Sequence, residues 1–141
     1  MIDYILYTDG GARGNPGSAG IGMVIQDSKG VILKEDSKFL GVATNNEAEY
    51  QAVIFGLESL KNLIGQDKLS NSTVELCLDS QLIARQIGKK YKIKEERLRR
   101  LCETVWALQS DLKLQLEIRE IPREENKEAD RLANEAMDRG L

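Results

Sequence analysis

The sequence predicts an α/β domain in which helices pack on the faces of a mixed β-sheet. The first third of the 141-residue chain alternates apolar and polar residues between short turns, a pattern typical of an antiparallel meander. The remainder switches repeatedly between helical and strand periodicity, and helices that separate strands favour parallel crossovers. With 41% hydrophobic residues, a chain of this length forms one domain with a substantial core.

Three strands are expected before the first helix. Residues 2–9 form the first strand, which ends in Asp-Gly-Gly and leads into a flexible, glycine-rich loop over residues 10–17. The alternation of Ile21, Met23 and Ile25 predicts the second strand. A turn at residues 27–30 then leads into a third strand over residues 31–39, so this pair reads as a β-hairpin.

Helical and strand periods alternate in the rest of the chain. Thr44 and Glu47 have the spacing of a capping box, which predicts that the first helix begins at Thr44. The expected elements that follow are a strand over 74–79, a helix over 81–88 capped by Ser80, a helix around 98–108, a strand over 114–118 and, after Pro122, a helix around 129–136.

Four acidic residues lie where predicted strands end or in the first turns of predicted helices: Asp9, Glu49, Asp79 and Asp130. Ligands gather at the carboxyl ends of parallel strands, so Asp9 and Asp79 converge if their strands are neighbours. Clustered carboxylates repel one another unless a cation joins them, and oxygen-only ligands select hard divalent cations such as Mg²⁺ or Mn²⁺. The set therefore predicts a metal site.

Helical geometry separates the two glutamates of TNNEAEY. Glu49 falls on the apolar stripe of its helix, at the N-terminal end where the helix dipole favours anions, whereas Glu47 already has a capping role. We therefore assign Glu49 to chemistry and Glu47 to structure. Each acid alone also has an ordinary interpretation as a salt bridge, turn, cap or dipole charge, so the functional argument depends on all four together.

Composition excludes several classes of function. The chain has no histidine, which rules out Ser-His-Asp triads and His-ligated zinc. Cys77 and Cys102 form no disulfide framework and are expected to be reduced core thiols, which favours the cytoplasm. No apolar run approaches the roughly 20 residues of a membrane span, and the N-terminus reads as a strand rather than a signal peptide.

The segments YTDGGARGNPGSAGIG, TNNEAEY, LDSQLI and IPREENKEADRLANEA resemble, in order, the four signature segments of the type 1 ribonuclease H family. The resemblance spans essentially the whole chain and implies a single catalytic domain over residues 1–141. It also implies a five-stranded mixed sheet in the order 3-2-1-4-5, with strand 2 antiparallel and helices on both faces. The implied activity is hydrolysis of the RNA strand of RNA/DNA hybrids, leaving 5′-phosphate and 3′-hydroxyl ends.

The resemblance also implies roles for individual residues. The four carboxylates would hold two divalent ions, Mg²⁺ or Mn²⁺, about 4 Å apart at the scissile phosphate, with Asp9 bridging both ions. Glu49 and Asp79 would ligate on one side and Asp130 on the other. The matching substrate-binding positions are Asn15, Asn45, Asn46 and Gln81 for the RNA strand and Thr44 for a DNA-strand phosphate. For Thr44, Asn45 and Asn46, helix capping and loop formation are the local alternatives.

The chain departs from the family pattern at two places. Arg123 or Glu124 lies where many members have a histidine, and a subset of the family uses an arginine there. We expect Arg123 to contact phosphate and aid turnover, although a permanently charged guanidinium cannot shuttle protons. Residues 88–94 replace a longer basic protrusion. Lys89 and Lys90 in this segment are expected to neutralise DNA-strand phosphates, the alternative being a solvated run of charge.

Other functional classes stay open at this point. A non-catalytic hybrid- or duplex-binding module could use the same fold, but such a module gains nothing from carboxylates set against phosphates. A related two-metal nuclease would also fit, with RNA/RNA duplexes as a substrate. The net charge of −3 argues weakly against nucleic-acid binding, although it conceals the basic segment around residues 89–100. The absence of a heptad seam leads us to expect a monomer.

Overall fold

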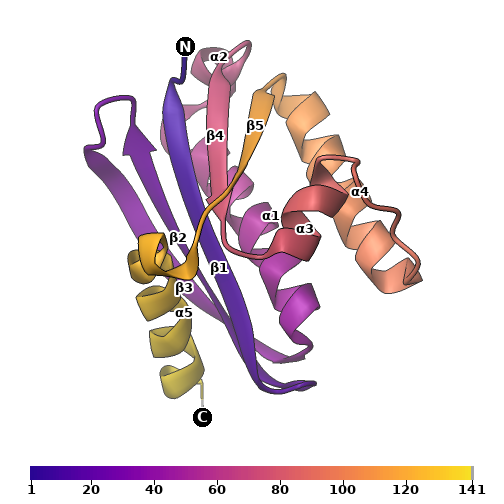
Figure 1. The fold of residues 1–141 in the computed structure, drawn as a ribbon. Coiled ribbons are helices and arrows are strands. Elements are labelled where there is room, and N and C mark those ends of the chain that lie inside the picture. The colour runs from indigo at the N-terminus through magenta and orange to yellow at the C-terminus, as the bar shows by residue number, and fades with distance from the viewer. Residues whose placement is uncertain (141) are drawn as a thin grey trace.

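The computed structural model describes residues 1–140, which fold around one five-stranded sheet (Figure 1). The strand order is β3-β2-β1-β4-β5, as expected. β2 is antiparallel to both β1 and β3, and β4 is parallel to both β1 and β5. The strands are β1 (Tyr4–Gly14), β2 (Gly17–Asp27), β3 (Ile32–Ala43), β4 (Thr73–Leu78) and β5 (Gln115–Glu120).

Helices cover both faces of the sheet (Figure 1). One face holds α1 (Asn45–Ile64) with α3 (Gln81–Ile87) and α4 (Glu96–Leu112), and the other holds α5 (Lys127–Arg139). Two short elements were not predicted, α2 (Gln66–Leu69) and the 3₁₀ helix η1 (Arg123–Glu125). The main core lies between the sheet and α1, where Leu6, Leu57 and Leu76 are fully buried.

The prediction of a flexible loop over residues 10–17 is wrong. β1 runs on to Gly14, and β2 starts at Gly17, so only Asn15 and Pro16 form the turn. Gly10 serves close packing rather than flexibility, because a Cβ there would lie 2.4 Å from the backbone of Ala48 in α1. Asp9 consequently lies inside a strand and not at its end.

The sheet nevertheless opens beside Asp9. Parallel pairing between β1 and β4 stops at Tyr7 and Cys77, while β1 continues its antiparallel pairing with β2. Asp9 on β1 and Asp79 just after β4 therefore flank the point where the two strands part, as the carboxyl-end argument required.

Two further sequence predictions concern the interior and the membrane. Cys77 and Cys102 are both buried and unpaired, as expected for core thiols. Among the helices of residues 1–140, none has the length and apolar character needed to cross a membrane.

Candidate active site

Three carboxylates meet where β1 and β4 part. Asp9 from β1, Glu49 from α1 and Asp79 after β4 each offer an oxygen atom, and these atoms lie within 4.8 Å of one another. Asp9 and Glu49 are each only 8% exposed, and Asp79 is half-buried. The sequence thus correctly predicted that residues far apart in the chain would converge.

The N-terminal part of α1 brings Glu49 to β1. Its Oε1 accepts a hydrogen bond of 2.7 Å from the backbone N–H of Gly10, and the missing Cβ of Gly10 lets the helix approach this closely. Thr44 caps the helix: its Oγ1 accepts from the N–H of Glu47, whose Oε1 accepts from the N–H of Thr44. The predicted division between a structural Glu47 and an inward-facing Glu49 is confirmed.

The cluster concentrates negative charge in a buried place. Burial raises the pKa of Asp9 well above its ordinary range, and the nearby carboxylates of Glu49 and Asp79 raise it further. Burial also raises the pKa of Glu49, against the opposing effect of the Gly10 hydrogen bond. Such a site is strained when fully ionised, and a bound cation would relieve the repulsion.

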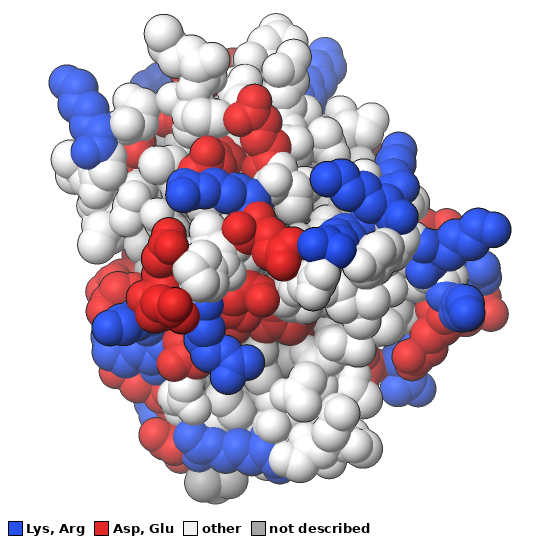
Figure 2. Space-filling model, viewed as in Figure 1, with Lys and Arg blue, Asp and Glu red and all other residues white. Residues whose placement is uncertain are grey.

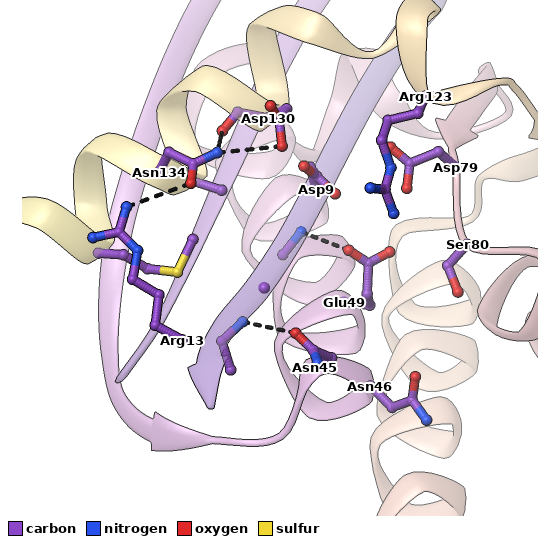
Figure 3. A pocket seen from close by; sticks show the side chains of 15 residues that line it. Asp9, Arg13, Asn45, Asn46, Glu49, Asp79, Ser80, Arg123, Asp130 and Asn134 are labelled. Atoms are coloured by element: carbon purple, nitrogen blue, oxygen red, sulfur yellow. Dashed lines mark hydrogen bonds between the residues drawn. The ribbon is translucent and has the colours of Figure 1, made fainter. Parts of the chain in front are cut away.

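Asp130 lies on the other side of Asp9, in the first turns of α5 (Figure 3). Asp130 also contributes to the raised pKa of Asp9, after burial and the carboxylates of Glu49 and Asp79, which places the two carboxyl groups near each other. All four predicted acids line one cavity of about 500 Å³. The other polar residues that line this cavity are Arg13, Asn45, Asn46, Ser80, Arg123 and Asn134.

Asn126 is a buried residue that contacts the site, and the sequence did not predict this role. It is 1% exposed, and its Nδ2 donates to the backbone oxygen of Thr8 at 2.9 Å and to Oδ2 of Asp79 at 3.1 Å. One amide group therefore ties the strand of Asp9 to the carboxylate of Asp79. The only sequence signal was its place in ENKEAD, between the 3₁₀ turn and α5.

The predicted substrate-binding residues divide into two groups. Asn45 and Asn46 line the cavity, and Asn45 Oδ1 accepts from the N–H of Ala12 at 2.8 Å. Asn15 stands next to them, since its Oδ1 accepts from the N–H of Asn45 at 3.0 Å. Together with the capping residue Thr44, they form one polar edge at the N-terminus of α1.

The other group lies outside the cavity lining. With its amide oxygen turned toward Arg85, Gln81 accepts from Nη1 of that residue at 2.7 Å. Lys89 Nζ is 4.9 Å from the centre of the Trp106 ring, and Lys90 lies near Tyr91 beyond α3. Figure 2 shows basic side chains gathered on the right, over α3, α4 and the segment between them, next to an acidic centre.

Arg123 projects from η1 into the cavity beside Asp79 (Figure 3). Its positive charge lowers the pKa of Glu49 and so offsets a part of the effect of burial. The Arg123 guanidinium therefore lies beside the acidic cluster, in the cavity that the four acids line.

Comparison with known proteins agrees with this geometry. Residues 7–136 match the family model described as reverse transcriptase-like. LC11-RNase H1, isolated from compost, is 47% identical with a TM-score of 0.93 over 99% of both chains, in a crystal structure in complex with an RNA/DNA hybrid. RNase H1 of Halobacterium salinarum is 36% identical with a TM-score of 0.87, over 97% of this chain and 98% of that one. The chain belongs to the ribonuclease H1 family.

Some curated relatives are longer than this chain. A bifunctional protein of Mycobacterium tuberculosis is 37% identical over 97% of this chain, which spans 36% of that protein. The chain spans 63% of a ribonuclease HI from Halobacterium salinarum, to which it is 38% identical.

Proposed function

We propose that this chain is a metal-dependent endoribonuclease that hydrolyses the RNA strand of RNA/DNA hybrids and leaves 5′-phosphate and 3′-hydroxyl ends. The observation that supports this best is the convergence of Asp9, Glu49 and Asp79 within 4.8 Å, with Asp130 in the same cavity. The 47% identity to a protein crystallised with such a hybrid supports the choice of substrate.

The donor set fits hard divalent cations. All four side chains offer carboxylate oxygens, which Mg²⁺ and Mn²⁺ prefer. Burial, together with the neighbouring carboxylates, raises the pKa values of Asp9 and Glu49, and such ions would stabilise the charged forms that burial disfavours. We propose that the four acids hold two ions, which when bound supply an activated water and stabilise the leaving 3′ oxygen. The N–H of Gly10 and the amide of Asn126 orient Glu49 and Asp79 for this role.

The polar edge at α1 is the proposed reader of the RNA strand. Amide side chains both donate and accept hydrogen bonds, which suits the 2′-hydroxyl groups that distinguish RNA from DNA. Asn15, Asn45 and Asn46 lie together there, and Gln81 approaches from the start of α3. Thr44 would contact a DNA-strand phosphate in addition to capping α1.

Arg123 and the basic segment are the proposed phosphate contacts. Arg123 lines the same cavity as the acids and would contact a phosphate and aid turnover. Arg123→Ala should therefore lower turnover or hybrid affinity. A variant that keeps both at wild-type values would refute this role. Lys89 and Lys90, on the neighbouring surface, would contact DNA-strand phosphates.

A cleavage assay tests the whole proposal. End-labelled RNA/DNA hybrid, single-stranded RNA and RNA duplex are incubated with the protein in Mg²⁺, in Mn²⁺ and in excess chelator. We expect metal-dependent cutting of the hybrid, and Asp79→Asn should bind the hybrid but cut at least about 100-fold more slowly. Hybrid binding without cutting would instead support a non-catalytic binding module, and undiminished cutting in chelator would exclude a metal-dependent site.

The same proposal has four further parts. Residues 1–141 would form one catalytic domain, acting as a monomer. The protein would work in the cytoplasm, consistent with its unpaired, buried cysteines. RNA/RNA duplexes would be a secondary substrate, which the duplex arm of the assay tests directly.

A further inference from the structure

A chain of polar contacts connects Asp130 to the far end of β1. Asn134, one turn after Asp130 in α5, donates from Nδ2 to the backbone oxygen of Asp130 at 2.9 Å and to its Oδ1 at 3.3 Å. Arg13 near the end of β1 donates to Oδ1 of Asn134 at 3.5 Å and pairs with Asp138. Figure 3 shows this series running along one wall of the cavity.

Arg13 determines which way the Asn134 amide faces. A guanidinium has hydrogen-bond donors and no acceptor, so only the oxygen of Asn134 is compatible with the side that faces Arg13. The amide nitrogen is then directed toward Asp130, where it meets two oxygen acceptors. The contact between Arg13 and Asn134, which are 121 positions apart in the sequence, thus orients the hydrogen bond from Asn134 to Asp130 within α5.

The charges along this series leave Asp130 free to bind a cation. Asp138 balances the charge of Arg13, and the group that touches Asp130 is a neutral amide. A lysine or arginine in direct contact would hold the carboxylate equally well, but it would compete with a divalent ion for the same oxygens. A neutral donor fixes the direction of a carboxylate without this competition.

We infer that Asn134 is a positioning residue for Asp130 and that Arg13 orients it, so that the fourth carboxylate is aligned before metal and substrate bind. This inference rests on the proposed function, in which Asp130 is a metal ligand. It predicts that loss of the amide weakens metal binding and turnover while the hybrid, held mainly by other residues, binds as before.

The test compares Asn134→Leu, which keeps the branching of the side chain but removes its polar atoms, with Asn134→Ala, which favours the helix. Calorimetric titration of the hybrid-free protein with Mn²⁺ should show affinity reduced about 10-fold in both variants, and kcat should fall similarly with KM unchanged. Arg13→Ala should act in the same direction, and its combination with Asn134→Leu should add little, because both residues act through one series of contacts. Arg139→Ala is the matched control in the same helix, since Arg139 contacts Ser37 and Glu135 instead.

The outcomes separate this inference from the proposed function. Wild-type Mn²⁺ affinity and kcat in both Asn134 variants would overturn the inference, as would fully additive effects of Arg13→Ala and Asn134→Leu. In either case the proposed function would still hold if the wild-type protein cuts the hybrid and the Asp130→Asn variant does not. A wild-type protein that does not cut would remove the proposed function, whatever the Asn134 variants show.

Discussion

Gly22 offers a direct test of how packing positions the site. A Cβ at this position in β2 would lie 2.3 Å from the backbone oxygen of Ala129, 2.7 Å from Cβ of Leu132 and 2.8 Å from the backbone nitrogen of Ala133. All three atoms belong to α5 and bracket Asp130. Ordinary contact begins near 3.4 Å, so Gly22→Ala should push this part of α5 away from the sheet by about 1 Å.

The displacement sets the size of both expected effects. Overpacking of this kind costs about 1–3 kcal/mol in the free energy of unfolding, which corresponds to a melting temperature lower by roughly 3–10 °C. Asp130 would move with the helix, and a misplacement of about 1 Å in a catalytic group can cost about 100-fold in rate. We therefore expect a folded protein with a much larger loss of kcat than its stability alone would explain.

Gly11→Ala is the matched control for this experiment. Gly11 also faces α5, but a Cβ there would meet its nearest neighbour, Cε of Met137, at an ordinary 3.7 Å. Thermal unfolding and steady-state cleavage of hybrid are measured for both variants under one set of conditions. If Gly22→Ala has the same melting temperature as Gly11→Ala and a kcat within about twofold of it, then the close approach of α5 does not determine where Asp130 lies.

Three other predictions follow from the same geometry. Asn126→Ala removes the donor to the Thr8 carbonyl and to Asp79, so chemical denaturation should show a loss of about 1–3 kcal/mol and kinetics a reduced kcat. In metal-free protein the raised pKa of Asp9 means that the native state binds more protons than the unfolded state does. The contribution of Asp9 to stability is therefore present below the ordinary carboxyl pKa near 4 and is lost as pH rises through the raised value. Asp9→Asn should therefore stabilise the chelator-treated protein at pH 8 but not at pH 4, and Mg²⁺ should stabilise only the wild type at pH 8; equal melting curves at both pH values would contradict this. Replacing the four lysines of residues 89–94 with alanine should weaken hybrid binding and flatten its salt dependence by roughly one unit of slope for each phosphate that is no longer neutralised, whereas an unchanged slope would mean a solvated surface.

Local sequence patterns predicted the parts of the site that depend on local structure. The capping box at Thr44 and the helical stripe that selects Glu49 involve residues within one or two turns, where spacing alone fixes the direction of a side chain. The strand order and the convergence of Asp9 with Asp79 needed the family resemblance in addition, because periodicity does not determine which strands are neighbours. The roles of the four acids in catalysis stay predictions until the cleavage assay is done.

Long-range partners explain what the sequence did not reveal. Asn126 reads as a helix-start residue, and only the tertiary fold brings it to Asp79, 47 positions away. Arg13 lies in a glycine-rich segment that predicts a loop, yet it belongs to a strand and contacts α5. The glycine-rich pattern of that segment predicts flexibility, although the role of Gly10 depends on the helix packed against it.

Glycine and carboxylate positions are two parts of one arrangement. Gly10 and Gly22 lie on neighbouring strands and face opposite sides of the sheet, where each admits the backbone of a helix: α1 at Gly10 and α5 at Gly22. α1 brings Glu49 to the N–H of Gly10, and α5 brings Asp130 to the side of Asp9, which pairs with Gly22 across the two strands. The acids therefore converge because each face of the sheet has one glycine at this level, so a larger residue at either glycine should separate the carboxylates before it unfolds the domain.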